Sequence, residues 1–317
     1  MYKQLTQAQR YTIFVLKQKK WTNKSIAEAI NVHPSTVSRE LRRNSMANGV
    51  YYHEKAEKLA RSRRNRVPGN RSISPAVRMV VRELILTEDW SPKQVSGYLK
   101  RERGISISHE TIYKMIREDA TGELAGHCRH KMRYKKKKKR KRETKATNIR
   151  NRVSIHERPA EADGTRFGDY EMDLIVDKRG NAILVIVERS TNFLLMAKLK
   201  EGRKAMPLAK DVRRLLLPYR GENLKSITTD NGSEFAEHEW ISRQLKTQVY
   251  FTDSYASWQK GCVENTNKLI RQYIPKGTDI STVSDKKIAM IQHKINKRPR
   301  EKLKFSTPVR EFFKYFM

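Results

Sequence analysis

Gly168-Asp-Tyr-Glu-Met-Asp-Leu-Ile-Val176 and Ala182-Ile-Leu-Val-Ile-Val-Glu188, joined by the turn Lys178-Arg-Gly-Asn181, are the stretches that decide the fold of the C-terminal half. The second stretch is a short apolar run with many β-branched residues, which is typical of a strand buried on both faces. A third strand pattern covers residues 193–198, after a Ser-Thr-Asn turn. Three strands joined by short turns predict a meander.

Helix and strand patterns alternate after this meander. We expect helices at 204–217, 237–245 and 259–273, strands at 224–229 and 248–251, and a final helix at 285–296. Three meandering strands followed by alternating helices and strands are the element order of a ribonuclease-H-like α/β domain. The sequence therefore predicts a five-stranded mixed sheet with flanking helices.

Acidic residues occupy distinctive positions in this predicted domain. Asp173 lies on the first strand, Asp230 directly follows the fourth, and Glu264 lies on the helix after the fifth. Ligands of open α/β sheets bind beyond the strand ends, and carboxylate oxygens are ligands that Mg²⁺ prefers. Strand alternation places Asp169 and Glu171 on the same face as Asp173, so periodicity alone does not choose among them.

The charge of the chain predicts a polyanionic partner. Its 317 residues include 68 Lys and Arg against 34 Asp and Glu, for a net charge of +34. Residues 1–150 carry 37 of the basic and 13 of the acidic residues. Solubility alone needs a net charge of only about 2–8 in a small domain, so this excess indicates nucleic acid held mainly by the N-terminal half.

Nothing in the sequence predicts export or a membrane span. The N-terminus has no apolar signal core, and no apolar run reaches the length of a transmembrane helix. The two cysteines, Cys128 and Cys262, are too few for a disulfide framework and fit a reducing cytosol. We expect a cytoplasmic protein without membrane contact.

The first 45 residues predict three short helices. Thr22 is a suitable N-cap for the second helix, and Pro34 suits the first position of the third. Apolar residues at helical spacing predict the inner faces: Leu5, Tyr11, Ile13, Phe14 and Leu16 for the first helix, Ile26 and Ile30 for the second, and Val37 and Leu41 for the third.

The outward face of the third helix predicts DNA binding. Two helices joined by a short turn, the second carrying small polar and Arg side chains, form the helix-turn-helix layout that reads a major groove. The alternative is an ordinary helical hairpin with a solvated basic face. The residues expected to contact DNA are Ser35, Thr36, Ser38, Arg39, Arg42 and Arg43.

A second helix-turn-helix pattern follows near residues 90–118. Ser91-Pro-Lys-Gln94 is a capping box with Pro at the first helical position, Gly104 ends that helix, and Ser108 can start the next. The Ile-Ser-Ile-Ser stretch after Gly104 could instead be strand-like, which would leave a plain helical connector. The expected inner residues are Val95, Leu99, Ile112 and Ile116.

Basic clusters separate the predicted domains. Arg61-Ser-Arg-Arg-Asn-Arg66 lies between the two helical patterns, and residues 131–142 are almost continuously basic. Dense like charge predicts a linker that is disordered when unbound and adds affinity for DNA through counterion release. We therefore expect a helix-turn-helix domain at 1–60, a second helical region at 61–128, a basic linker at 129–160 and the catalytic domain at 161–317.

Several motifs together resemble one family. Ser35-Thr-Val-Ser-Arg-Glu40, Gly168-Asp-Tyr-Glu-Met-Asp173, Thr229-Asp-Asn-Gly-Ser-Glu-Phe235 and Ser257-Trp-Gln-Lys-Gly-Cys-Val-Glu264 are similar to motifs of the insertion-sequence-thirty family of bacterial DDE transposases. The 33 residues between Asp230 and Glu264 match the spacing of that family. Tyr170 stands where Trp is common, and Met172 and Cys262-Val263 also depart from the pattern, but no carboxylate is replaced.

The resemblance implies a function and a set of site residues. It selects Asp173, rather than Asp169 or Glu171, to act with Asp230 and Glu264 as catalytic residues and ligands of two Mg²⁺ ions, for which Mn²⁺ can substitute. It implies that the helix-turn-helix regions bind the terminal inverted repeats of an insertion sequence, and that the enzyme cleaves there and transfers the strand to target DNA. It also implies a homodimer or larger assembly on double-stranded DNA, associated with the bacterial nucleoid.

Residues near Glu264 extend the predicted site. Lys268 and Arg271 fall on the same helical face as Glu264, and we expect both to contact substrate phosphate. The alternative is an ion pair between Glu264 and Lys268, with Arg271 merely solvated. For Trp258 we expect packing in the protein, with stacking on a DNA base as the alternative.

Two other functions fit parts of the sequence. A DNA-binding regulator without catalysis would need only the N-terminal half, but it leaves the three acidic residues without a purpose. A ribonuclease-H-like nuclease would use the acidic residues to cut DNA without joining it.

Overall fold

The computed structural model describes residues 4–46, 48–64, 73–129, 131–132, 149–254 and 256–316. The chain forms two compact units, 1–74 and 75–317. The basic segment 133–142 and residues 65–66 lie outside the described residues, so their predicted linker role stays a prediction. Among the helices described, none is both long and apolar enough to cross a membrane.

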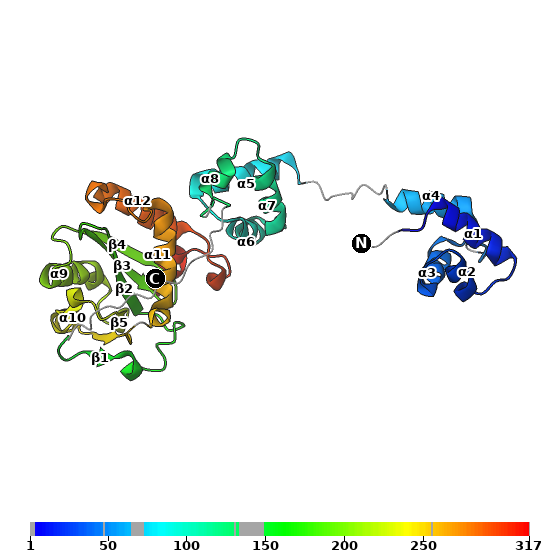
Figure 1. The fold of residues 1–317 in the computed structure, drawn as a ribbon. Helices are drawn as coiled ribbons and strands as arrows, with labels where there is room; N and C mark the ends of the chain where they lie inside the picture. The colour runs from blue at the N-terminus through cyan, green and yellow to red at the C-terminus, as the bar shows by residue number, and fades with distance from the viewer. Residues whose placement is uncertain are drawn as a thin grey trace. The chain divides into compact units, whose positions relative to one another are not determined.

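The N-terminal unit is helical and contains the predicted helix-turn-helix. Its helices are α1 (Gln7–Gln18), α2 (Asn23–Ala29), α3 (Pro34–Asn44) and α4 (His53–Arg64) (Figure 1). The predicted starts are confirmed, because Thr22 Oγ1 accepts a hydrogen bond from Ser25 N at 3.2 Å and Pro34 opens α3. The sequence analysis missed α4, which adds Ala56 to the core around Ile26.

A buried ion network ties this unit together. Arg10 on α1 donates to Glu40 on α3 and to Glu57 on α4, both at 2.8 Å, and Tyr51 also donates to Glu40 at 3.1 Å. Because Arg10 takes an inward position on α1, the neighbouring Tyr11 points outward. The prediction that Tyr11 belongs to the apolar face is therefore wrong.

The second helical region is confirmed as helical. It comprises α5 (Pro75–Glu88), α6 (Pro92–Arg103), α7 (His109–Glu118) and α8 (Glu123–His127). The capping box of Ser91 and Gln94 is present, and Gly104 ends α6 with φ of 64°, a left-handed conformation that suits glycine. Ser108 caps α7 through Thr111 N at 3.1 Å. The strand alternative for residues 105–108 is wrong.

A mixed six-stranded sheet forms the centre of the C-terminal domain. Its strands are β1 (Val153–Ser154), β2 (Asp169–Val176), β3 (Ala182–Glu188), β4 (Leu194–Leu199), β5 (Ser226–Thr229) and β6 (Gln248–Phe251), in the order β1-β6-β5-β2-β3-β4. The meander β2-β3-β4 is antiparallel, and the other pairings are parallel. The five expected strands are present. The additional strand β1 has only two residues, too few to show a period, and lies within the segment expected to be a linker.

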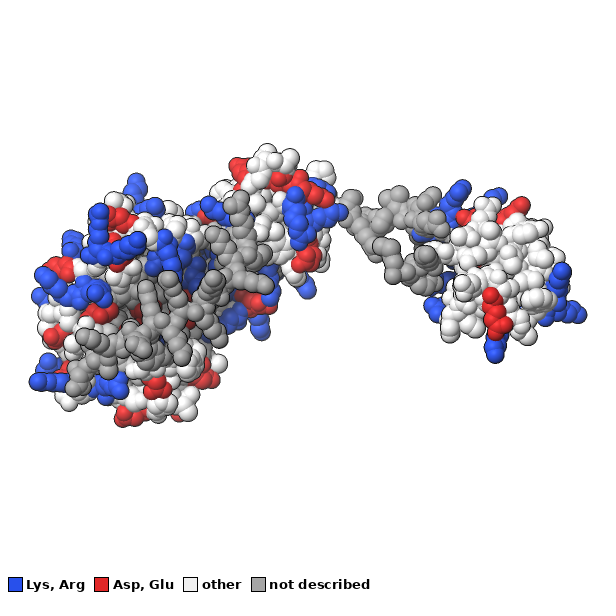
Figure 2. Space-filling model, viewed as in Figure 1, with Lys and Arg blue, Asp and Glu red and all other residues white. Residues whose placement is uncertain are grey.

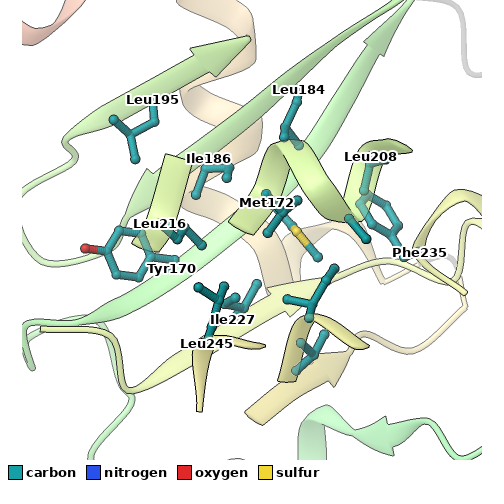
Figure 3. Close-up of a cluster of buried hydrophobic side chains, with 14 of the residues drawn as sticks. Tyr170, Met172, Leu184, Ile186, Leu195, Leu208, Leu216, Ile227, Phe235 and Leu245 are labelled. Atoms are coloured by element: carbon teal, nitrogen blue, oxygen red, sulfur yellow. The ribbon is translucent and has the colours of Figure 1, made fainter. Parts of the chain in front are cut away.

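Helices cover both faces of this sheet. The apolar cluster on one face joins the sheet to α9 (Ala205–Leu216) and α10 (His238–Leu245), and Figure 3 shows Tyr170 and Met172 of β2 within it. The cluster on the other face joins the sheet to α11 (Gly261–Tyr273) and α12 (Asp285–Lys297). Strand alternation therefore directs Glu171 and Asp173 toward the face of the sheet that α11 covers.

The open edge of the sheet is closed by side chains of α12. Asn296 Oδ1 accepts from Leu194 N, and Asn296 Nδ2 donates to Leu194 O, both at 2.8 Å. Gln292 Oε1 accepts from Met196 N at 2.6 Å. These amides satisfy backbone groups of β4 that would otherwise invite pairing with another strand. A last helix, α13 (Pro308–Phe313), follows.

One carboxylate joins the second helical region to the helices that cover the sheet, within the C-terminal unit. Asp89, just after α5, accepts from His127 Nδ1 and Lys294 Nζ, both at 2.7 Å, and from the Tyr273 hydroxyl at 3.2 Å. Burial alone would raise the pKa of Asp89, but hydrogen bonds from these partners hold it below its ordinary value.

Candidate active site

Two of the three predicted acidic residues meet at the end of a parallel strand pair. The register of β2 and β5 aligns Asp169 with Ser226 and Glu171 with Thr228. Extending it by two residues places Asp173 opposite Asp230, just beyond the end of β5. Adjacent strands lie about 4.8 Å apart, so these two side chains form a carboxylate pair on the face that α11 covers.

The side chain of Lys260 bridges this carboxylate pair. Lys260 Nζ lies 3.3 Å from Asp173 Oδ1 and 2.9 Å from Asp230 Oδ2, and the Lys260 side chain is only 5% exposed. Burial disfavours its charge, but the two carboxylates outweigh burial and hold the pKa of Lys260 above its ordinary value. Burial, with the charge of Asp230, raises the pKa of Asp173 against the opposing charge of Lys260. The pair thus already holds one cation.

Glu264 lies on the same face of α11 as the residues that hold Asp173. Asn267 donates to Asp173 Oδ2 at 2.7 Å, and Lys260 contacts Asp173 from the start of the helix. Glu264 follows Lys260 by four residues and precedes Asn267 by three, and residues so spaced share one helical face. Glu264 is half-buried in the first turn of α11.

The structure distinguishes the three acidic residues of β2. Asp169 is buried and paired with Arg166 at 2.8 Å. Glu171 is buried, accepts from Arg189 Nε at 3.0 Å and also accepts from Val263 N at 2.9 Å. Asp173, by contrast, has no arginine partner among the described residues and shares Lys260 with a second carboxylate, Asp230.

The chemistry of this group of side chains suits a divalent metal. Two carboxylates from adjacent strands converge on one positive charge, and the third predicted acid lies on the facing helix. Within the described ranges, no three His, Cys, Asp or Glu side chains stand close enough to hold a metal ion as they are. Without a metal, three carboxylates would repel one another, and the single positive charge of Lys260 balances only one of them.

The other predicted residues of α11 are placed as follows. Lys268 is exposed, and in the described structure no ion pair joins it to Glu264, so that alternative is wrong. Arg271 is half-buried, and its guanidinium lies 3.5 Å from the carbonyl oxygens of Ile274 and Pro275. Trp258 is 76% exposed. The packing prediction for Trp258 is wrong, because the short turn before α11 directs its ring into solvent.

The predicted DNA-contacting face of α3 is accessible. Ser38, Arg39, Arg42 and Arg43 are exposed, whereas Ser35 and Thr36 are half-buried. Arg39 Nη2 donates to Ser35 Oγ at 2.6 Å, which orients its guanidinium along the helix. On the face drawn in Figure 2, basic side chains spread over both units with acidic ones among them.

Sequence reasoning missed Lys260 and Asn267 as site residues. Both signals were present, because Lys260 precedes Glu264 by one helical turn and Asn267 follows it by nearly one.

Comparisons with known proteins agree with the predicted helix-turn-helix regions. Residues 1–44 match the model of a helix-turn-helix domain, and residues 51–116 match that of a homeodomain-like domain. The chain is 41% identical to the transposase for insertion sequence element IS4351 of Bacteroides fragilis, over 98% of this chain and 96% of that protein. It is 33% identical to transposase InsI for insertion sequence element IS30A of Escherichia coli, over 96% and 82% of the two chains.

A solved structure is also similar. The catalytic core domain of BIV integrase aligns with a TM-score of 0.37 at 17% identity, over 48% of this chain and 97% of that one. Helix-turn-helix regions ahead of a mixed α/β domain, together with the two transposase relatives, define a transposase with DNA-binding domains. More narrowly, the chain belongs to the IS30 family of transposases.

Proposed function

We propose that this transposase cleaves DNA strands at the terminal inverted repeats of an insertion sequence and joins them to target DNA, using Asp173, Asp230 and Glu264. One observation carries the proposal. Asp173 and Asp230 converge from adjacent strands on a single cation, whereas Asp169 and Glu171 on the same strand are paired with arginines. The carboxylate pair is thus available for chemistry, and its neighbours are not.

These three acids would hold divalent metal. Their hard oxygen donors suit Mg²⁺, with Mn²⁺ as a substitute. When bound, two such ions supply activation of the attacking oxygen and stabilisation of the leaving oxygen in phosphodiester chemistry. Asn267 holds Asp173 by its Oδ2 atom and so fixes the direction of its carboxylate.

Other side chains bind and orient the DNA. Lys268 and Arg271, on the same face of α11 as Glu264, bind phosphates beside the scissile bond. The exposed residues of α3 read the inverted repeat, and the second helical region adds further contacts along it. Two repeats bound at once call for a homodimer or larger assembly, acting at the nucleoid in the bacterial cytoplasm.

The reaction needs no nucleophile from the protein. In cleavage, a water oxygen bonds to the scissile phosphorus and the bond to the 3′ oxygen breaks, which leaves a 3′-OH. In joining, that 3′ oxygen bonds to a target phosphorus and a bridging bond of the target strand breaks. Neither Cys128 nor Cys262 takes part. Burial raises the pKa of Cys262 to about 11 and so keeps its thiol protonated.

A cleavage assay with end-labelled inverted-repeat DNA tests this proposal. The repeats are taken from the DNA that flanks the reading frame. We expect Asp230→Asn to abolish Mg²⁺-dependent cleavage and to retain binding of the repeat in a gel-shift assay. Asp211→Asn on α9, which removes an acid paired with Arg214, is the matched control and should cleave normally. Full cleavage by Asp230→Asn would refute the site.

The same assay separates the two alternative functions. A regulator without catalysis would bind the repeat and produce no nick with Mg²⁺. A nuclease would nick the repeat but yield no product joined to target DNA. We expect both nicked and joined products.

A further inference from the structure

The bridge by Lys260 has a consequence for metal binding. Its ammonium contacts Asp173 Oδ1 and Asp230 Oδ2, which are oxygens that a metal ion between the two strands would need. An ammonium and a divalent cation repel each other at such distances. Metal therefore binds only after Lys260 has left the carboxylate pair.

The fold allows this departure. Lys260 is the last residue of a short 3-10 turn (Ser257–Lys260), and Gly261 then begins α11. A Cβ at Gly261 would meet nothing within 4 Å, so the chain next to Lys260 is not enclosed. The four-carbon stem of lysine lets its charge move to a new partner without a change in the helix.

The displaced ammonium needs another anion. Leaving a charge in a partly buried site without a partner is costly. The partner of suitable chemistry that the proposed substrate brings is a DNA phosphate beside the carboxylate pair. Phosphate thus draws the ammonium away from the carboxylates at the same time as metal displaces it from them.

We propose that Lys260 is a counter-ion latch that couples metal loading to DNA binding. In the free protein its ammonium pairs with Asp173 and Asp230 and weakens metal binding, and in the complex it binds a DNA phosphate and releases both carboxylates. This inference rests on the proposed function. Because coupling between two ligands is reciprocal, DNA must raise the affinity for metal, and metal must raise the affinity for DNA.

Calorimetric titration of the full-length protein with MnCl₂ tests the latch. Each protein is titrated alone and with a duplex that ends at the cleaved inverted repeat and carries a 3′-deoxy terminus, so neither cleavage nor joining contributes heat. For the natural protein we expect the duplex to tighten Mn²⁺ binding by about 5- to 150-fold, the usual range of coupling between two sites. Lys260→Met keeps most of the stem and removes the charge.

Lys260→Met should separate the effect of the lysine charge on Mn²⁺ binding from the effect of the duplex. We expect Lys260→Met alone to bind Mn²⁺ about tenfold more tightly than the natural protein, with little further gain from the duplex. It should also cleave more slowly, because no ammonium remains to bind the phosphate. Lys260→Gln is the second variant. Lys287→Met, which removes an exposed charge from α12, is the control and should match the natural protein.

Thermal unfolding with and without Mn²⁺ distinguishes a latch from a lysine that only stabilises the fold. Without metal, Lys260→Met should unfold at a lower temperature, because the two carboxylates then repel each other. Mn²⁺ should raise its unfolding temperature more than that of the natural protein.

The outcomes distinguish the latch from the proposed function. If Lys260→Met and Lys260→Gln bind Mn²⁺ no more tightly than the natural protein, or if DNA strengthens binding equally in all of them, the latch is wrong and the metal site stands. If no protein binds Mn²⁺ with or without DNA, while Asp230→Asn behaves identically, the proposed function is wrong and the latch falls with it.

Discussion

The start and the middle of strand β2 use acidic side chains in opposite ways. At its start, Asp169 and Glu171 are buried and each is paired with an arginine. In its middle, Asp173 shares one lysine with Asp230, and these two side chains are 23% and 43% exposed. A planar guanidinium fixes a carboxylate through two or more hydrogen bonds, whereas a lysine ammonium is a compact charge on a flexible stem. The first arrangement is structural, and the second leaves a net negative charge that a metal can exploit.

The largest expected effect concerns Glu264, the predicted third acid of the site, which lies on α11. Glu264→Gln should lower Mg²⁺-dependent cleavage at least about a thousandfold, because metal-held charge stabilisation is worth several kcal/mol in the transition state. Rates of cleavage under single-turnover conditions measure this. Near-normal cleavage would show that Glu264 stands outside the site and that only the carboxylate pair acts.

The next effect concerns the start of the strand and is one of stability. Glu171→Ala should reduce the free energy of unfolding by about 3–5 kcal/mol, because it leaves Arg189 buried without its partner. Asp173→Asn should cost less than Glu171→Ala, since the asparagine can still accept a hydrogen bond from Lys260, which keeps Asp230 as its charged partner. Urea denaturation measures both. Equal losses would contradict the distinction between a structural role for Glu171 and a functional role for Asp173.

Asp89 tests whether a lysine partner alone makes a carboxylate functional. It has Lys294 as a partner but no second carboxylate, so we treat it as structural. Asp89→Asn should cost about 2 kcal/mol, the value of hydrogen bonds to a charged group. Because the pKa of Asp89 is lowered in the folded protein, its contribution is present above the unfolded pKa and is lost as the pH falls through the folded pKa. Urea denaturation at pH 7 and pH 3 measures this loss, and a natural protein whose advantage over Asp89→Asn is no smaller at pH 3 than at pH 7 would contradict it.

The smallest effect extends the comparison to arginines. Arg10 and Arg189 form ion pairs with buried carboxylates. Arg42 and Arg43 on α3 are exposed. Arg42→Ala or Arg43→Ala should weaken repeat binding by about 1 kcal/mol, and the slope of log affinity against log salt should fall by about one for each phosphate contact removed. Fluorescence anisotropy at several salt concentrations measures the slope. An unchanged slope of log affinity against log salt would show that neither arginine contacts a DNA phosphate.

Much of the fold was predictable because local signals agree with tertiary structure. The bounds of β3 and β6 match the sequence expectation, since both are short apolar runs between clear turns. The caps at Thr22, Ser91 and Ser108 also act as expected, because capping depends on neighbouring backbone alone. Strand β1 was not predictable, because two residues show no period and its pairing with β6 is set by distant sequence.

The site was predictable only in part, because charge type does not reveal partners. Periodicity placed Asp169, Glu171 and Asp173 on one face of the strand. Only the folded structure shows which of these acids form an ion pair with an arginine. The basic residues of Lys297-Arg-Pro-Arg300, whose charge alone would suggest an exposed segment, illustrate the same limit. Arg298 and Arg300 are buried, and Asn296 closes the edge of β4, so this segment is largely structural.

Anomalous diffraction at the manganese edge, from crystals of the full chain with Mn²⁺ and inverted-repeat DNA, tests the central claim most directly. We expect a manganese peak about 2.0–2.2 Å from oxygens of Asp173 and Asp230, with Glu264 turned in to complete the coordination. Manganese bound elsewhere, or bound without any of these three carboxylates, would contradict it.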